Sequence, residues 1–397
     1  MSIRGQRGEQ RRFVLLSCLL PLIQLRRSVS GCPAWLPQGS PLGRFHHMVI
    51  SLWHNRLRVF LAVQALVLAP AATHGQSPAW EPLKVETTAS FRGLSVVDDR
   101  VVWASGTRGT VIRTIDGGTT WSVESLPGAA TFDLRGIHAR NANVAHVAAT
   151  SGRIWRTTDG GRSWSLRYQS ADTSMFLDAI VFVSDRVGFT LGDPMGGRFV
   201  MLVTRDGGAT WSEGPTNSRP EAMEGEAAFA ASGTSLVFAN PQLGWLGTGG
   251  SVARVFRTVN GGASWTVASS AIPPRAGSGG VFSVAFAGLL NGIVVGGDYE
   301  RPDSTRGTSA FTQDGGVTWQ PSASFPRGYR SGVAMRRASQ GELIAIAVGT
   351  TGSDISRDGG RTWSPLDGMA FNSVQFAPSG VAFAVGGRGR VARLPAR

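Results

Sequence analysis

The chain has few of the side chains that form disulfides, bind metals or act as nucleophiles. Its 397 residues include two cysteines, Cys18 and Cys32, and both precede residue 76. The remainder therefore has no disulfide framework, thiolate metal site or cysteine nucleophile. It has two histidines, His138 and His146, both within expected strands, and no His-x-Glu, Cys-x-x-Cys-His or Gly-x-Ser-x-Gly context. The sequence predicts no cofactor and no metal.

Lysine is nearly absent after residue 75, where Lys84 is the only one. The formal net charge of +13 is uneven, because residues 1–75 hold nine arginines and one acidic residue, Glu9. The rest carries 30 basic and 25 acidic side chains, a mild +5. Nucleic-acid binding needs clustered Lys/Arg with interleaved aromatics, and the arginines here are dispersed. We therefore expect no nucleic-acid partner.

Two apolar runs precede residue 76. The first, 13–25, is too short to span a bilayer as a helix. The second follows Met48, Arg56 and Arg58, covers 59–72 and ends near Gly75, which is the layout of a secretory signal peptide. We predict a misassigned or untranslated leader at 1–47, a signal peptide at 48–75 and one domain at 76–397, with a membrane anchor as the alternative. An exported chain without disulfides favours a bacterial periplasm or the cell exterior.

Six copies of Ser/Thr-x-Asp-x-Gly-x-Ser/Thr-Trp, the Asp-box or BNR repeat, organise the domain. The first is 114–121, and the intervals between successive motif tryptophans are 43, 47, 54, 54 and 44 residues. Periods in this range indicate a propeller, solenoid or array. The acidic side chain accepts backbone N–H groups in a tight turn, and the tryptophan packs between sheets. The motif thus predicts architecture and no chemistry. Its third positions are Asp116, Asp159, Asp206, Asn260, Asp314 and Asp358.

Each repeat contains three short apolar runs before the box. In the first they are 93–97, 101–106 and 111–113, and strands follow turns at about ten-residue spacing. A seventh unit, 374–393, lacks a box, and 80–85 has no other partner. The sequence therefore predicts an all-β fold, a seven-bladed β-propeller of four-stranded antiparallel blades with Asp-box turns, closed by the N-terminal strand. Six or eight blades are the alternatives.

All boxes should lie on one face, and the long connections 213–226, 271–280 and 298–308 on the other, where binding is expected. We interpret this second face as a mixed Arg/acid docking surface, the alternative being that its charges only pair and cap turns. Residues that begin the innermost strands would ring the channel mouth: Arg92, Arg135, Asp178, Thr234, Phe282, Ser331 and Asn372. Nearby connections add Asp193, Glu224, Glu226, Asp298, Tyr299 and Arg330.

Units such as 109–118 and 152–161 resemble the photosystem II stability/assembly factor family, secreted seven-bladed Asp-box propellers. The resemblance covers nearly all of 80–397. The stretches 225–234 and 296–299 are similar to a non-photosynthetic branch often labelled oxidoreductase-like, although no nucleotide fingerprint, haem motif or redox cysteine pair supports that label. The resemblance implies a non-catalytic lumenal or periplasmic protein that binds other proteins during membrane-complex assembly through an Arg-containing surface. We expect a monomer with a protein partner, such as a membrane-complex subunit.

The alternative is a glycoside hydrolase with a glycan partner, because sialidases and some glycanases also use Asp-box propellers. A sialidase needs an arginine triad and a tyrosine activated by a glutamate, and the sequence around Arg92 lacks the proline-containing arginine motif. Two carboxylates across the channel could instead form an acid/base pair. We favour no enzymatic activity. The catalytic candidates of the alternative are Asp193, Glu226, Asp298 and Tyr299.

Overall fold

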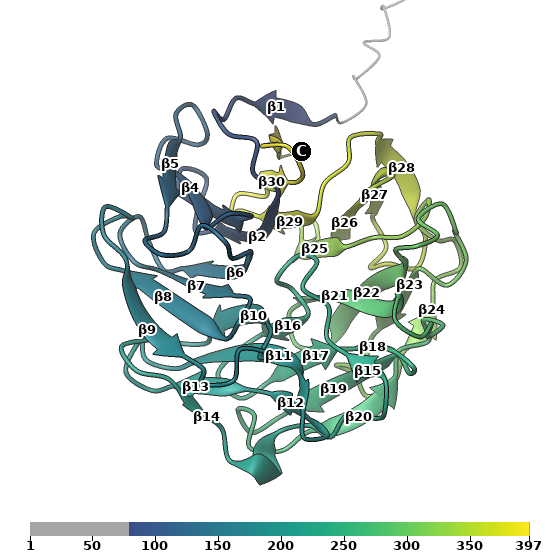
Figure 1. The fold of residues 1–397 in the computed structure, drawn as a ribbon. Helices are drawn as coiled ribbons and strands as arrows, with labels where there is room; N and C mark the ends of the chain where they lie inside the picture. Colours follow the sequence, from purple (N-terminus) through teal and green to yellow (C-terminus); the bar gives the residue numbers. More distant parts are fainter. Residues whose placement is uncertain (1–78, 397) are drawn as a thin grey trace, which may run out of the picture. The chain divides into compact units, whose positions relative to one another are not determined.

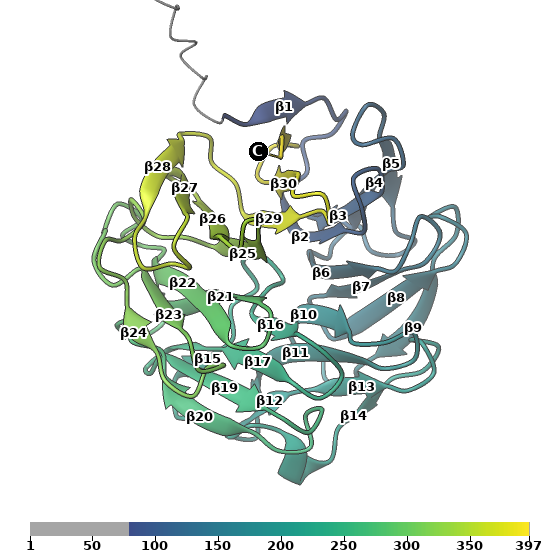
Figure 2. The ribbon, with the colours of Figure 1, turned by 180° about the vertical axis from the view of Figure 1, so that it is seen from behind.

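The computed structural model describes residues 79–396, which form seven β-sheets arranged in a ring (Figure 1). Seen from behind, the innermost strand of each sheet lies beside the central channel (Figure 2). This confirms the all-β, seven-bladed propeller with four-stranded antiparallel blades. The predicted leader and signal peptide lie outside the described residues. No helix within the described part is long and apolar enough to cross a membrane.

Four blades have the regular four-strand order, innermost strand first. Blade 1 is β2 (Phe91–Val96), β3 (Val102–Gly106), β4 (Thr110–Thr114) and β5 (Ser122–Ser125). Blade 2 is β6 (Leu134–Ala139), β7 (Ala145–Ala149), β8 (Arg153–Thr157) and β9 (Ser165–Gln169). Blade 4 is β16 (Leu236–Phe238), β17 (Gly244–Gly247), β19 (Arg254–Thr258) and β20 (Thr266–Ser269). Blade 6 is β25 (Gly332–Arg337), β26 (Leu343–Gly349), β27 (Gly352–Ser356) and β28 (Ser364–Asp367).

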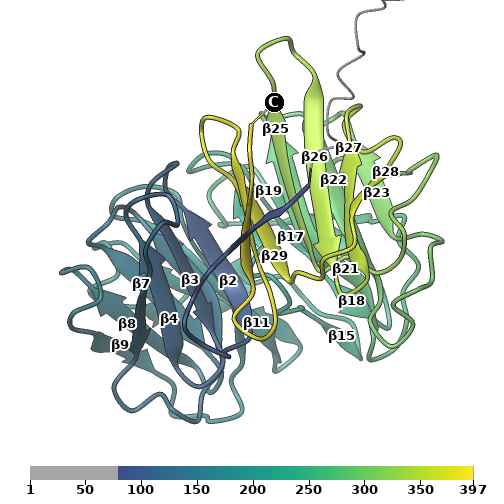
Figure 3. The ribbon, with the colours of Figure 1, turned by 90° about the horizontal axis from the view of Figure 1, so that it is seen from above.

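Blades 3 and 5 carry additional strands. Blade 3 is β10 (Leu177–Phe182), β11 (Gly188–Met195), β13 (Leu202–Thr204) and β14 (Ser212–Glu213), with β12 (Arg198–Val200) paired to β11 and a 3₁₀ turn at Thr216–Ser218. Blade 5 is β21 (Gly279–Ala287), β22 (Asn291–Asp298), β23 (Ser309–Thr312) and β24 (Gln320–Pro321). The short strands β15 (Glu226–Ala227) and β18 (Gly249–Gly250) extend this sheet past β21 (Figure 3).

Blade 7 closes the ring, as predicted. It consists of β29 (Ser373–Phe376), β30 (Ala382–Val385), β31 (Val391–Leu394) and the N-terminal β1 (Glu81–Leu83). Glu81 pairs with Arg393 in the β1–β31 ladder, and their side chains form an ion pair at 2.9 Å. Trp80 fixes the start of β1, because its ring packs on Phe371 and its Nε1 donates to Ser353 Oγ at 2.9 Å. Pairing with β1 covers the outer edge of β31 and leaves the three-residue β1 as the short edge strand of the blade.

The boxes are tight turns held by the acidic side chain. In the first, the N–H of Thr120 donates to Asp116 Oδ1 at 2.9 Å and the Thr120 hydroxyl donates to Oδ2 at 2.6 Å. Gly117 and Gly118 have φ of 74° and 91°, which explains why glycine stands there. In the fourth box Asn260 keeps the contact, since the N–H of Ser264 donates to its Oδ1 at 2.9 Å. The turn also packs on the preceding hairpin, through Gly117 N–H to Arg100 O at 3.0 Å.

Hydrophobic packing fills the spaces between adjacent blades. Trp103 of β3 is 1% exposed, lies edge-on to the box tryptophan Trp164 of blade 2, and donates from Nε1 to Asn141 O at 3.2 Å. Trp245 of β17 plays the same part between blades 4 and 5, donating to Gly315 O at 2.8 Å. The boxes therefore join neighbouring blades as well as neighbouring strands.

The carboxylates of the boxes should make stability pH-dependent. Hydrogen bonds from the side chain and then the backbone of Ser163 lower the pKa of Asp159 to about 2, against an ordinary value of 3.8. Because the folded-state pKa is the lower one, the stabilisation is present above the unfolded-state pKa and is lost as pH falls through the folded-state pKa. We expect Asp159→Asn to lower the Tm less than Asp159→Ala, since Asn260 shows that an amide fits this turn.

The Tm difference between the wild type and Asp159→Asn should shrink as pH falls from about 6 to about 2. Thermal unfolding followed by circular dichroism across that range measures it. A difference that does not change with pH would mean that the charge of Asp159 does not stabilise the turn.

Candidate functional site

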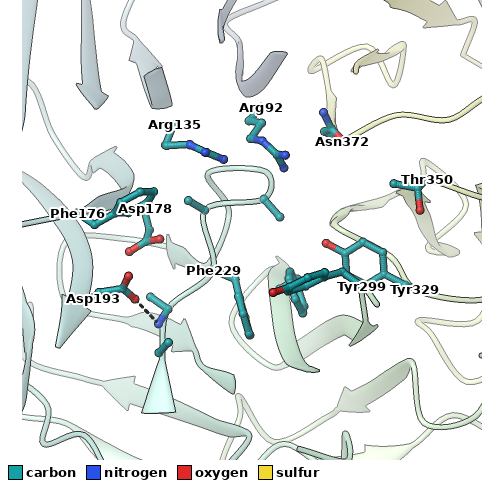
Figure 4. Close-up of a pocket in the computed structure, with 15 residues that line it drawn as sticks. Arg92, Arg135, Phe176, Asp178, Asp193, Phe229, Tyr299, Tyr329, Thr350 and Asn372 are labelled. Carbon is teal, nitrogen blue, oxygen red and sulfur yellow. Dashed lines mark hydrogen bonds between the residues drawn. The ribbon is translucent and has the colours of Figure 1, made fainter. Parts of the chain in front are cut away.

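A cavity of about 640 Å³ opens at the channel mouth on the face opposite the boxes (Figure 4). Its walls come from the beginnings of innermost strands, because Arg92 lies in β2, Arg135 in β6, Asp178 in β10 and Phe282 in β21. Asp193 near the end of β11 also lines it. The remaining lining residues are Phe176, Ala227, Ala228, Phe229, Ala230, Ala231, Tyr299, Tyr329, Thr350 and Asn372.

Four β-bulges place side chains at this mouth. In blade 1, Phe91 pairs with Gly106 and Gly93 with Ser105, so Arg92 is the extra, unpaired residue. The ladders of blades 2, 3 and 5 skip Arg135, Asp178 and Phe282 in the same way. A bulge re-aims the side chain of its extra residue and bends the strand. Four equivalent bulges thus turn four side chains toward one cavity.

The segment 228–234, between β15 and β16, closes the channel beneath the cavity. Ser373 of β29 donates from Oγ to Ser232 O at 3.1 Å, and the hydroxyls of Thr234 and Ser283 lie 2.6 Å apart. A Cβ placed on Gly233 would be 3.4 Å from the backbone oxygen of Arg135. The segment therefore reaches blades 2, 5 and 7, and the cavity is a bowl whose floor is formed by 227–231.

Two arginines converge on one side of the bowl (Figure 4). Arg135 Nη2 lies 3.0 Å from Asp133 Oδ2, its guanidinium lies 5.6 Å from the Phe176 ring centre, and its Nε is buried without a partner. Burial lowers the pKa of Arg135, and the nearby charge of Arg92 lowers it further. The side chain of Arg92 forms no hydrogen bond or ion pair with any residue of 79–396.

Two carboxyl groups line the adjacent wall. Asp178 is 1% exposed, and its Oδ2 has no hydrogen-bond partner among the described residues. Asp193 Oδ1 accepts the N–H of Ala228 at 3.1 Å, which ties β11 to the floor. Burial raises the pKa of Asp178 well above its usual range, the charge of Asp193 raises it further, and Arg135 opposes this. Burial likewise raises the pKa of Asp193.

An aromatic wall faces these charged groups. Phe229 of the floor stacks on Phe282 at 3.8 Å between ring centres, and Tyr329 meets Phe282 edge-on at 4.8 Å. Tyr299 also meets Phe282 edge-on, at 6.2 Å. Burial raises the pKa of Tyr329, so its hydroxyl remains protonated at neutral pH. The bowl thus combines cationic, acidic and aromatic surfaces.

Several sequence-predicted site residues lie elsewhere. Glu226 is buried and accepts Arg254 Nε at 2.9 Å, while Arg330, fully buried, donates from Nε to Asp354 Oδ2 at 2.8 Å. Asp298 pairs with Arg275 at 2.8 Å. Glu224 is exposed and uses its backbone oxygen to accept Ser251 Oγ. Two further strand-start residues, Thr234 and Ser331, also lie outside the cavity lining.

The structure therefore brings together Arg92, Arg135, Asp178, Asp193 and Tyr299 of the predicted site, with Phe282 and Asn372 of the strand starts. Sequence reasoning did not place Phe176, Phe229, Thr350 or the alanines in the site. The signal for the floor is the run 227–233, in which every residue except Phe229 is small. Within 79–396, no group of three or more His, Cys, Asp or Glu side chains could hold a metal ion.

Comparisons with known proteins agree with this architecture. The family model described as "BNR/Asp-box repeat" matches residues 354–365. No curated protein matches the chain. The structure described as "YCF48 bound to D1 peptide" is 18% identical with a TM-score of 0.58, covering 81% of this chain and 100% of that one.

Two further structures are similar. YCF48 from Cyanidioschyzon merolae is 18% identical with a TM-score of 0.56, covering 80% of this chain and 98% of that one. The GH74 xyloglucanase from Xanthomonas campestris is 16% identical with a TM-score of 0.56, covering 79% of this chain and 53% of that chain. Identities this low establish the fold alone. The chain is thus an Asp-box seven-bladed propeller with the fold of YCF48, and the non-photosynthetic, oxidoreductase-like branch stays a prediction.

Paired and unpaired charges should respond differently to substitution. Asp354→Ala leaves Arg330 buried without its partner, which should cost about 3–5 kcal/mol of unfolding free energy. Arg92→Ala removes a side chain with no hydrogen bond or ion pair, and should change that free energy by about 0.5 kcal/mol or less. Denaturant titration of both variants measures the two values. Equal losses of unfolding free energy would show that the side chain of Arg92 stabilises the fold.

Proposed function

We propose that this protein is an exported, non-catalytic binding propeller, a monomer that docks a partner protein through the bowl at its channel mouth. A subunit of a membrane protein complex is the partner we favour. The observation that carries the proposal is the pair of converging arginines, of which Arg92 has no partner within 79–396. Export itself is inferred from residues 48–75, whose sequence has signal-peptide layout.

An unpaired arginine in a concave site favours an anionic ligand group. Guanidinium groups bind carboxylates through paired, charge-assisted hydrogen bonds, and arginine and tyrosine are enriched among residues that dominate binding energy. Burial lowers the pKa of Arg135 and the charge of Arg92 adds to this effect, so an anion between the two guanidinium groups would offset their repulsion. The proposed partner segment therefore carries a carboxylate.

The other surfaces of the bowl suit a peptide segment. The volume of about 640 Å³ lies within the range of ligand pockets, and the aromatic wall of Phe229, Phe282 and Tyr329 offers a place for an apolar side chain. YCF48, which shares the fold, has been solved with a bound D1 peptide. That precedent supports a peptide segment as the ligand here.

The proposal can be tested by selecting binders from a random library of short peptides. We expect the protein lacking residues 1–75 to enrich peptides that carry a carboxylate, and Arg92→Gln/Arg135→Gln to lose most of that enrichment. Arg100→Gln is the matched control, because Arg100 is exposed at the opposite end of the same blade and does not line the bowl. Its enrichment should equal that of the wild type.

Thermal unfolding of the wild type and both variants must accompany the selection, so that lost binding is not mistaken for lost folding. Peptides enriched equally by the wild type and the double variant would refute a docking role for these arginines. No enrichment by the wild type would count against peptide binding altogether.

A second candidate function is glycoside hydrolysis. The observation in its favour is that Asp178 and Asp193 line one wall with raised pKa values, as a general acid requires. The GH74 xyloglucanase has the same fold across its matched part. Of the other catalytic candidates, Glu226 and Asp298 are engaged in ion pairs, and Tyr299 Oη donates to Gly277 O at 3.1 Å.

Turnover assays on xyloglucan and a wider panel of oligosaccharides decide this candidate. If the protein is a hydrolase, Asp193→Asn should abolish turnover without unfolding, because the amide still accepts the Ala228 N–H but cannot transfer a proton. Absence of turnover by the wild type across the panel would leave the binding role.

A further inference from the structure

We propose that Asp178 and Asp193 form a subsite for a primary ammonium group, so that the bowl recognises a ligand carrying an amine as well as a carboxylate. This inference rests on the proposed binding function and specifies the ligand chemistry. The two residues lie on neighbouring strands, β10 and β11, and their carboxyl groups occupy the same wall (Figure 4). The amine could come from a chain N-terminus or from a lysine side chain.

The first argument is that Asp178 has an unmet hydrogen-bonding requirement. It is 1% exposed, and its Oδ2 accepts no hydrogen bond from any residue of 79–396. A buried carboxyl oxygen without a donor is unfavourable, and most such atoms in folded proteins are satisfied. Because Asp178 lines the bowl, a ligand entering the bowl can supply the donor that the protein does not.

The second argument is the charge around the pair. Asp193 on β11 and Arg135 on β6 are the charged groups that act on Asp178, and the guanidinium of Arg135 already pairs with Asp133 at 3.0 Å. Repulsion between the two charged forms makes it unfavourable for both neighbouring carboxyls to ionise in a desolvated site. An ammonium group carries three donors and one compact positive charge, so it can bridge both oxygens and offset that repulsion.

Other occupants fit this wall less well. A metal ion would need more ligands than two carboxylates, and the described residues offer no group of three or more His, Cys, Asp or Glu. A neutral sugar hydroxyl would satisfy one oxygen but leave the repulsion between the carboxylates in place. With Arg92 and Arg135 beside the acidic pair, the bowl matches a ligand in which positive and negative groups lie close together.

Three related probes test the subsite by titration calorimetry. Glycyl-phenylalanine carries a carboxylate and a chain-terminal amine. N-acetyl-lysyl-phenylalanine carries a carboxylate and a side-chain amine, and N-acetyl-glycyl-phenylalanine carries the carboxylate alone. All three offer the same ring to the aromatic wall. We expect at least one amine-bearing probe to bind about tenfold more tightly than the third, because a charge-assisted hydrogen bond contributes on that scale. The preferred probe identifies the source of the amine.

The matched variant is Asp178→Asn, which preserves volume and removes the charge. We expect it to abolish the preference for the amine while keeping the affinity for N-acetyl-glycyl-phenylalanine, and to leave the Tm unchanged or higher, because a desolvated carboxyl has been removed. Asp193→Asn should reduce the preference while keeping the bond from Ala228 N–H. Arg92→Gln should instead weaken all three probes together.

The outcomes separate this inference from the function on which it rests. Equal binding of the three probes, or no measurable binding of any, would overturn the ammonium subsite, and so would a preference that survives Asp178→Asn. Binding that depends on Arg92 but not on the amine would keep the proposed function and remove only the subsite. Binding of neutral oligosaccharides that is lost in Asp178→Asn would assign the carboxyl pair to sugar hydroxyls and overturn the ammonium subsite.

Discussion

Closure of the ring by β1 and β31 is the constraint on which the rest of the structure depends. Three strands of blade 7 come from the C-terminal part of the domain and the fourth from residues 81–83, so this blade is complete only when both ends of the domain meet. Closure brings seven innermost strands around one channel, where little room remains for side chains. The segment 228–234 fits there because it consists of small residues apart from Phe229. Ring geometry thus creates both the mouth and its floor.

The bulges direct side chains of the innermost strands into the cavity. A regular strand alternates its side chains between the two faces of its sheet, which in a propeller are the interfaces with neighbouring blades. Arg92, Arg135 and Asp178 avoid those interfaces because each is the extra residue of a bulge. The same irregularity in blade 5 presents Phe282 to the aromatic wall. Three polar residues and one apolar residue occupy equivalent positions in blades 1, 2, 3 and 5, so the side chain of the bulge varies between blades. The innermost ladders of blades 4, 6 and 7 have no such register shift.

The sequence predicted the repeat well and the site in part. Six boxes at near-constant spacing defined the blades, and the unpaired segment 80–85 indicated the closing strand, because these features depend on local turn chemistry and periodicity. Alignment of the repeats also located Arg92, Arg135 and Asp178. Long-range contacts explain why other predicted site residues lie elsewhere. Glu226 and Arg330, in nearby connections, were expected at the same mouth, but their partners Arg254 and Asp354 lie more than twenty residues away along the chain.

The framework of this protein and its candidate site differ in how a buried carboxyl group is paired. Between blades 4 and 6 two buried carboxylates have donors. Glu226 accepts hydrogen bonds from Arg254 and from a backbone N–H, and Asp354 accepts one from Arg330. At the channel mouth, Asp178 Oδ2 has no hydrogen-bond partner among the described residues, although Asp178 is as deeply buried as Asp354. Asp178 and Asp354 thus contrast a buried carboxyl oxygen without a donor with a buried carboxylate that is paired. A ligand that donates to Asp178 Oδ2 would give this carboxyl what Arg330 gives Asp354 within the fold.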